Sequence, residues 1–262
     1  MKIGFIGCGN MAKSIIEGIL STELFEKDRI FASAADQSKL QKYCENIGIH
    51  ACENKKIATL CDIILLCVKP QKFPVVLPEI ASLLREEQVI ISIAAGKTIA
   101  YIQEQIGNQK IIRVMPNLNA KIKQSASALC ANALCNKEDI KIGEKIFGSI
   151  GKVFRVDEGE FSAFSAVACC SPAFSFMYMD ALAKEGIACG LDTQTAYAAA
   201  LYSVKASASL LDFSDESPQA LVDKVCSPGG TTIEGVKKLE EFSFEQTVRE
   251  AVHASYLRDK EL

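Results

Sequence analysis

The sequence has little excess charge and no long stretch of apolar residues. It carries 29 Lys and Arg residues against 32 Asp and Glu residues, a formal net charge of −3, with no long run of either sign. The basic surface of a nucleic-acid-binding protein is therefore missing. No charged leader precedes "MKIGFIG", and no apolar run approaches the length that spans a bilayer. We therefore expect a cytoplasmic protein with neither a nucleic-acid nor a membrane partner.

The sequence also lacks the spacings that bind metals. It has 11 cysteines but no C-x-x-C pair, and its two histidines, His50 and His253, lie far apart. Many cysteines fall inside apolar runs, as Cys61 and Cys67 do in "CDIILLCV". We interpret them as reduced thiols that pack as small hydrophobic side chains, and we expect no metal site.

Short β-rich runs alternate with helical patterns in the first part of the chain. The predicted strands cover residues 2–7, 29–33, 61–68, 88–96, 110–115, 125–130 and 151–156. Their apolar residues do not alternate with polar ones, which is typical of parallel strands covered on both faces. The pattern predicts an α/β fold with a Rossmann-type, doubly wound parallel sheet in an N-terminal domain over residues 1–158.

The strand signals stop after this point, and residues 159–262 are predicted to form an all-α domain. Residues 195–213, "TAYAAALYSVKASASLLDF", carry Ala, Ser, Leu and Tyr around most of the helix circumference. Such a helix is buried on more than one side, and a domain of about 100 residues encloses it with difficulty. We expect a second subunit to complete the burial in a homodimer. A central helix in a monomeric bundle is the alternative.

A glycine-rich loop follows the first predicted strand. "IGFIGCGNMA" places Gly7, Gly9 and Ala12 in the G-x-G-x-x-G/A spacing, directly before a helix. In this motif the first glycine allows a tight turn, and the second lets a pyrophosphate approach the backbone. The N-terminus of the helix then faces the anion. The position after a strand in an α/β domain predicts a dinucleotide site.

The second predicted strand bears on the choice of dinucleotide. NAD sites usually carry Asp or Glu at its end, whereas here the turn holds Ser33 and Ala34. This small uncharged turn leaves room for a 2′-phosphate, so we expect NADPH, with NADH as the alternative. Asp36 is interpreted as a residue at the N-terminus of a helix rather than as a ribose ligand.

Two further strand ends carry candidate cofactor residues. "CVKPQ" places Val68, Lys69 and Pro70 beyond the carboxyl end of a strand, where ligands of doubly wound sheets bind. "RVMPN" places Met115 and Asn117 at another strand end. Lys69 either faces the cofactor or extends along the surface. Asn117 either hydrogen-bonds a substrate or a nicotinamide amide, or is a turn residue after proline.

The late loop "SPGGTT" precedes the helical pattern "TIEGVKKLE". Glycine N–H groups, threonine hydroxyls and a helix N-terminus all donate hydrogen bonds to an anion, so the loop suits a carboxylate. The residues expected to hold it are Gly229, Gly230, Thr231 and Thr232. The alternative is an ordinary turn with Thr231 or Thr232 as the N-cap.

The residue inventory narrows the reaction. Carbonyl reduction needs a general acid, commonly Lys, His or Tyr, near the reacting oxygen. The helix predicted to open the second domain has neither Lys nor His in "FSAFSAVACCSPAFSFMYMDAL", which leaves Tyr178. A cyclic imine is basic enough to take its proton from solvent, so its reduction needs mainly positioning. The inventory favours imine reduction.

Five motifs together resemble pyrroline-5-carboxylate reductase over essentially the whole chain. They are "GFIGCGNMA", "VKPQ", "RVMPN", "SPAF" and "CSPGGTTIEGVKKLE", in that order. The resemblance implies reduction of 1-pyrroline-5-carboxylate to L-proline with NAD(P)H, the last step of proline biosynthesis. It also implies a dimer with interlocked helical domains, in which the late loop completes a site with the other subunit, and in many members a pentamer of dimers.

The resemblance also implies roles for individual residues. The pyrophosphate would be held by Gly7, Gly9, Asn10 and Met11. Val68, Lys69, Pro70 and Asn54 would line the cofactor, with Ser33 at the turn after the second strand. Met115 and Asn117 would face the nicotinamide region. The late loop would hold the substrate carboxylate, with Thr232 as the catalytic position.

The chain departs from the family pattern twice. Where the family usually has G-S-G-P-A, this chain has Cys169 to Ala173, "CCSPA", and where it usually has M-P-N-T-P, this chain has "MPNLN" with Leu118 and Asn119. A 3-hydroxyacid dehydrogenase of related plan is a second enzyme hypothesis. A non-catalytic NADP-binding regulator is a third, suggested by the altered "CCSPA" segment, whereas the intact "SPGGTT" argues against it.

Overall fold

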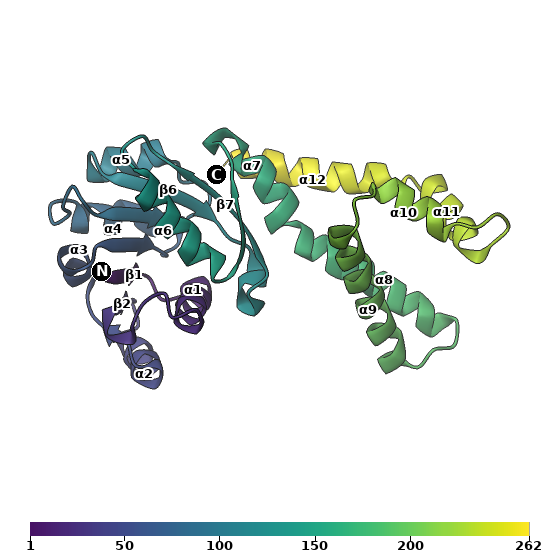
Figure 1. Ribbon diagram of the computed structural model, residues 1–262, viewed down its shortest axis with the longest axis horizontal. Coiled ribbons are helices and arrows are strands. Elements are labelled where there is room, and N and C mark those ends of the chain that lie inside the picture. The colour runs from purple at the N-terminus through teal and green to yellow at the C-terminus, as the bar shows by residue number, and fades with distance from the viewer. Residues whose placement is uncertain (262) are drawn as a thin grey trace. The chain divides into compact units, whose positions relative to one another are not determined.

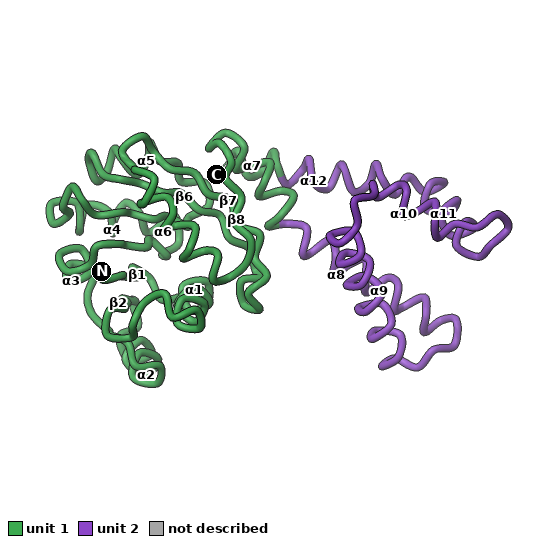
Figure 2. Tube along the Cα trace, viewed as in Figure 1, with its two compact units in different colours: residues 1–169, 256–262 green, residues 170–255 purple. Residues whose placement is uncertain are grey.

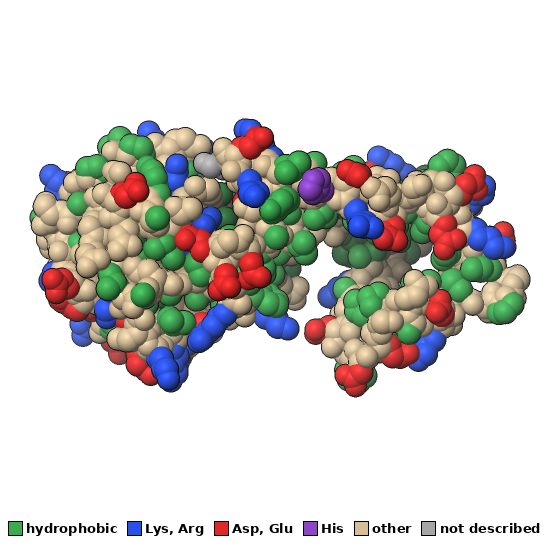
Figure 3. Space-filling view, turned by 90° about the horizontal axis from the view of Figure 1, so that it is seen from above, with side chains coloured by type: hydrophobic (Ala, Val, Ile, Leu, Met, Phe, Trp, Pro, Cys, Tyr) green, Lys and Arg blue, Asp and Glu red, His purple; other side chains and the backbone are tan. Residues whose placement is uncertain are grey.

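The computed structural model describes residues 1–261, which form two compact units. One unit comprises residues 1–169 and 256–261, and the other comprises residues 170–255 (Figure 2). The visible surface in Figure 3 carries acidic and basic side chains interspersed, without a field of one sign.

The first unit is built on an eight-stranded sheet with the order β3-β2-β1-β4-β5-β6-β7-β8. Figure 1 shows this sheet among the helices of the first unit. The strands are β1 Ile3–Ile6, β2 Ile30–Ser33, β3 His50–Ala51, β4 Ile63–Leu66, β5 Val89–Ser92, β6 Lys110–Met115, β7 Ser125–Ala131 and β8 Gly151–Arg155. All residues of β1, β2, β4 and β5 are buried, because helices cover both faces. The expected doubly wound fold is confirmed.

Two groups of helices cover the sheet. One hydrophobic core contains buried residues of α1 Asn10–Ser21, α2 Gln37–Ile47 and α6 Lys137–Gly148. The core on the other face contains buried residues of α3 Asn54–Leu60, α4 Phe73–Ala81 and α5 Ile99–Ile106. Strands β2 and β3 extend from one side of β1, and β4 to β6 extend from the other. The switch point therefore lies between β1 and β4, and ligands bind at such points in open α/β sheets.

The sheet differs from the predicted one at two places. Strand β7 pairs antiparallel with β6, and β8 then pairs parallel with β7. Only residues 116–124, which include the 3₁₀ helix Leu118–Ile122, join β6 to β7. A parallel crossover needs a dozen or more residues, so this connection permits only the antiparallel pair. Strand β3 and helix α3 are also absent from the sequence prediction. His50 in β3 stacks on Phe31, with ring centroids 4.8 Å apart.

The remaining elements are helical. Residues 158–169 contain the 3₁₀ helix Glu158–Glu160, α7 Phe161–Phe164 and the π-helix Ser165–Cys169. They are followed by α8 Ser171–Ala188, α9 Thr193–Phe213, α10 Pro218–Val225, α11 Thr231–Glu241 and α12 Phe244–Lys260. The predicted all-helical C-terminal part is confirmed.

Helix α9 leaves most of its surface uncovered in the single chain. It packs on α8 through Ala196 and Ala200, the only α9 residues that are buried. Tyr202 is 67% exposed and Leu201 is 50% exposed. The helix is therefore not the centre of a monomeric bundle, which was the alternative to burial by a second subunit.

One continuous helical stretch, Glu158–Ala188, is long and apolar enough to cross a membrane by length and composition. The expectation that no segment reaches this length is thus not met. This is weak support for a membrane segment, because core helices of soluble proteins have the same properties.

Candidate functional site

The glycine loop follows β1 and begins with a residue that has no room for a side chain. Gly7 has φ +97°, and a Cβ atom there would lie 2.8 Å from the Val68 nitrogen and 2.9 Å from the Cys67 carbonyl carbon. Backbone atoms cannot move aside as a flexible side chain can. Gly9 differs, since a Cβ atom built there would meet nothing within 4 Å. The loop backbone is thus packed against Cys67 and Val68 at Gly7, whereas the space beside Gly9 is open.

The open side of this loop leads to the N-terminus of α1. Gly9 is the N-cap and supplies no side-chain hydrogen bond, and the first turn contains no acidic residue. The first ladder bond joins the Lys13 nitrogen to the Gly9 carbonyl oxygen at 3.0 Å. The N–H groups of Asn10, Met11 and Ala12 therefore have no helical partner. Together with the helix dipole they suit an anion such as a pyrophosphate.

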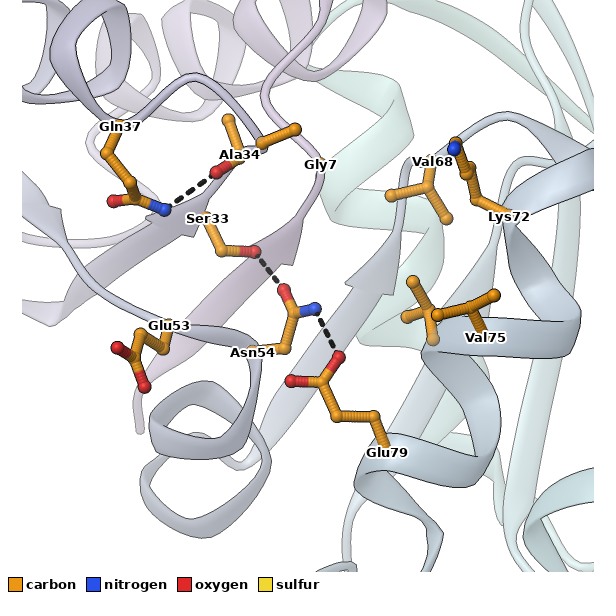
Figure 4. A pocket seen from close by; sticks show the side chains of 12 residues that line it. Gly7, Ser33, Ala34, Gln37, Glu53, Asn54, Val68, Lys72, Val75 and Glu79 are labelled. Atoms are coloured by element: carbon orange, nitrogen blue, oxygen red, sulfur yellow. Dashed lines mark hydrogen bonds between the residues drawn. The ribbon is translucent and has the colours of Figure 1, made fainter.

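A cavity of about 390 Å³ lies beside this loop, at the carboxyl ends of β1, β2 and β4 (Figure 4). It brings together four of the predicted cofactor residues, which are Gly7, Ser33, Asn54 and Val68. The lining also includes residues that pattern analysis did not single out for a site: Ala35, Gln37, Glu53, Lys72, Val75, Val76 and Glu79. Ala34, predicted at the strand end, completes it. The other predicted cofactor residues are not among the residues that line it.

Three polar side chains form a hydrogen-bonded chain across this cavity. The Ser33 hydroxyl donates to Asn54 Oδ1 at 2.6 Å, and Asn54 Nδ2 donates to Glu79 Oε2 at 2.8 Å (Figure 4). Ser33 ends β2, Asn54 begins α3, and Glu79 lies in α4. Sequence reasoning missed Glu79 because only the packing of α4 against α3 brings it to Asn54.

Asp36, which follows β2, lies at the N-terminus of a helix, as predicted. Its side chain is the N-cap of α2 and accepts a hydrogen bond from the Lys39 nitrogen at 3.0 Å. This backbone hydrogen bond lowers the pKa of the Asp36 carboxyl. Asp36 is not among the residues that line the cavity, and its capping bond explains its position.

The strand end after β4 leads into a 3₁₀ turn. Lys69 precedes the turn Pro70–Lys72, and its side chain is exposed. Neither Lys69 nor Pro70 lines the cavity. Within residues 1–261, no hydrogen bond or ion pair engages the Lys69 ammonium group. Their roles as cofactor residues stay predictions.

Asn117, after β6, is engaged inside the first unit. It is 6% exposed; its Nδ2 donates to the Ala168 carbonyl at 2.8 Å, and its Oδ1 accepts from the Asn119 nitrogen at 3.1 Å. The side chain thus links the strand end to the π-helix Ser165–Cys169, and such helices are frequent at functional sites. Met115 is the last residue of β6, two positions earlier, and it is buried. Direct ligand contact by either residue remains a prediction.

The late loop is a tight turn that leads into α11. Gly229 has φ +71°, and the Gly230 nitrogen donates to the Ser227 carbonyl at 3.0 Å. The N-cap of α11 is Gly230, so the alternative that Thr231 or Thr232 caps the helix is wrong. Both threonines lie in the first turn and are exposed. Their hydroxyls make no hydrogen bond among the described residues, which leaves them available to a carboxylate.

The thiols near the cofactor loop are poor nucleophiles. Burial raises the pKa of the Cys8 thiol, which Lys13 partly offsets, and burial strongly raises the pKa of Cys67. No disulfide joins any of the 11 cysteines. Across residues 1–261, no group of three or more His, Cys, Asp and Glu side chains is arranged to hold a metal ion.

The fold and the loop define the class of protein, a two-domain protein with a Rossmann-type dinucleotide-binding domain. Residues 2–96 match the family model described as NADP oxidoreductase, coenzyme F420-dependent. Residues 158–262 match the model described as pyrroline-5-carboxylate reductase dimerisation. The chain belongs to the pyrroline-5-carboxylate reductase family.

Relatives of known name cover almost the whole chain. The chain is 34% identical over 262 residues to pyrroline-5-carboxylate reductase of Arabidopsis thaliana, covering 100% of this chain and 95% of that protein. It is 37% identical over 253 residues to the Escherichia coli enzyme, covering 96% and 94%.

Solved structures agree. The Plasmodium falciparum pyrroline carboxylate reductase with NADP bound is similar with a TM-score of 0.90 at 30% identity, covering 100% of this chain and 97% of that one. The Coxiella burnetii pyrroline-5-carboxylate reductase gives a TM-score of 0.93 at 31% identity, covering 99% and 97%.

Proposed function

We propose that this protein reduces 1-pyrroline-5-carboxylate to L-proline with NAD(P)H, the last step of proline biosynthesis. Membership of the reductase family over the full length carries this proposal. The bound cofactor supplies a hydride to the C=N bond of the imine. Because the imine nitrogen takes its proton from solvent, the chain itself has to orient the substrate and hold its carboxylate. Membership of this family favours imine reduction over the reaction of a 3-hydroxyacid dehydrogenase.

The cofactor is assigned to the first unit. Gly7, Gly9, Asn10 and Met11 hold the pyrophosphate, supported by the open space at Gly9 and the unpartnered N–H groups of α1. Ser33 and Asn54 face the adenosine ribose, supported by their place in the cavity at the end of β2. We assign Val68, Lys69, Pro70 and Met115 to the cofactor. Asn117, at the nicotinamide end, is assigned to the substrate.

The substrate carboxylate is assigned to the late loop. The positive φ of Gly229, the N-terminus of α11 and the unengaged hydroxyls of Thr231 and Thr232 support this assignment. Gly230 donates its N–H within the loop and keeps the turn closed. Thr232 is assigned the catalytic position, where its hydroxyl orients the substrate.

We propose that the protein forms homodimers in the cytoplasm. It has no membrane or nucleic-acid partner in this proposal. The uncovered apolar residues of α9 and the dimerisation match support a dimer, in which the apolar stretch Glu158–Ala188 is a packing helix. We place the functional boundary between residues 158 and 159, and we propose a pentamer of dimers as the larger assembly.

The decisive experiment follows the loss of reduced nicotinamide absorbance with purified protein and 1-pyrroline-5-carboxylate, using NADPH and then NADH. Substrate-dependent oxidation establishes the reductase, and the two rates rank the cofactors. Binding of NADPH without turnover, together with no calorimetric signal from a proline analogue, would refute the proposal in favour of a non-catalytic regulator. It would implicate "CCSPA" as the altered segment.

A further inference from the structure

Glu79 occupies an unusual place for an acidic residue in a cavity expected to receive a phosphorylated ribose. In Rossmann-type sites the end of β2 faces the ribose 2′ position, and here that end is Ser33. We propose that Glu79 is a positioning residue that weakens the preference for the 2′-phosphorylated cofactor by fixing the hydrogen bonds of Asn54 and Ser33. This inference rests on the proposed cofactor site.

The carboxylate of Glu79 determines the direction of the whole hydrogen-bonded chain. A carboxylate only accepts hydrogen bonds, so the Asn54 group that lies 2.8 Å from Glu79 Oε2 must be its amide nitrogen. The Asn54 oxygen therefore faces Ser33 and accepts the hydroxyl proton at 2.6 Å. A serine hydroxyl has one proton to donate. The Phe5 carbonyl lies 3.4 Å from the same hydroxyl, and the much shorter distance to Asn54 directs the proton there. Ser33 therefore offers only lone pairs to a ligand in the cavity.

This polarity discriminates between the two ribose groups. A 2′-hydroxyl can donate to the lone pairs of Ser33, whereas a 2′-phosphate presents only acceptor oxygens and negative charge. The lining contains two carboxylates, Glu53 and Glu79, against one cation, Lys72. Among residues 1–261, no arginine, the residue that commonly receives a 2′-phosphate, lines the cavity. The polarity of Ser33 further favours a ribose 2′-hydroxyl over a 2′-phosphate.

The test is the substitution Glu79→Gln, which keeps the shape and removes the charge. The glutamine amide can donate to Asn54, so the Asn54 side chain can turn and offer its nitrogen to Ser33. The Ser33 hydroxyl then no longer donates to Asn54, and it can donate to a phosphate oxygen in place of the Phe5 carbonyl, which lies 3.4 Å from its Oγ. We expect adenosine 2′,5′-bisphosphate to bind about three- to tenfold more tightly, because one nearby charge contributes on this scale in water-accessible sites. Binding of 5′-AMP, which lacks the 2′-phosphate, should change little.

The matched control is Glu53→Gln, which removes a second carboxylate from the same cavity. Glu53 is exposed, and none of the hydrogen bonds among the described residues involves its side chain. Its effect should be smaller and should fade at high salt, because exposed charges are screened. A gain in E53Q equal to that in E79Q would show that bulk charge alone is responsible and would overturn the proposal.

Calorimetry of both nucleotides with wild type, E79Q and E53Q decides the question without turnover, and the NADPH-to-NADH ratio of kcat/KM should shift in parallel. Equal changes for both nucleotides in E79Q would indicate a merely structural role and overturn the proposal, as would no change for the bisphosphate. Turnover with an unaltered ratio overturns this inference alone. The expected nucleotide shift without turnover supports it while refuting the reductase function, and failure of wild type to bind either nucleotide overturns both.

Discussion

The two glycines of the first loop should respond in opposite ways to the same substitution. Gly7→Ala places a Cβ atom 2.8 Å from the Val68 nitrogen at a residue with φ +97°. The left-handed conformation costs about 1–2 kcal/mol for an alanine, and forcing an atom into a packed site costs about 1–3 kcal/mol. We expect G7A to lose about 2–5 kcal/mol of unfolding free energy as the sum of these terms.

Gly9→Ala is the matched variant, since its Cβ atom meets nothing within 4 Å. Replacing a glycine N-cap by alanine costs less than about 1 kcal/mol. The new methyl group instead occupies the space assigned to the pyrophosphate, so G9A should fold normally and bind NADPH at least about tenfold more weakly.

Urea unfolding followed by circular dichroism, with NADPH titration of each folded variant, separates the two effects. Wild-type stability in G7A would refute the steric argument. Wild-type NADPH affinity in G9A would refute the assignment of the open side of the loop to the cofactor.

Three further outcomes follow from the structure. Thr232→Val should weaken binding of a proline analogue by about 1–3 kcal/mol while sparing NADPH, because one hydroxyl donor is lost; equal losses for both ligands by calorimetry would contradict its role. Tyr202→Glu should give the mass of a monomer in sedimentation, since Tyr202 is 67% exposed and α9 is assigned to the subunit interface; an unchanged mass would place the interface elsewhere. Burial raises the pKa of Cys44 to about 11 and of Cys61 to about 12, from 9.0. Above pH 9 the unfolded state releases these two thiol protons, whereas the folded state still holds them. The contribution of the two protonated thiols to the free energy of unfolding is therefore complete below pH 9 and is lost as pH rises toward 12. Urea unfolding at several alkaline pH values checks the slope, and a flat profile would contradict it.

The predictable parts of the fold were those with a local cause. Strands β1, β4 and β5 are buried on both faces, so each is a plain apolar run in the sequence. The antiparallel pairing of β7 was missed although the short connection after Met115 excludes a crossover. The two-residue strand β3 has too few residues for any periodic pattern.

The residues of the candidate site also fall into those that the local sequence predicted and those that it did not. Gly7 and Gly9 were found because a tight turn and a close approach each need a glycine at a set spacing. Asn117 shows the opposite case, because its sequence context cannot reveal that both ends of its side chain are hydrogen-bonded within the first unit. The N-cap of α11 depends on the backbone angles of Gly230, which the neighbouring threonines obscured.

The sequence by itself determined the family, the alternation of strands and helices, and the glycine loops, because these depend on residue order over short distances. Only the tertiary structure decided which side chains meet. Ser33, Asn54 and Glu79 lie in three different elements, and their hydrogen bonds form because α3 and α4 pack on the same face of the sheet beside the end of β2. The polarity of the ribose site is a property of that packing, since a hydrogen bond requires contact within about 3 Å and distance along the chain carries no such information.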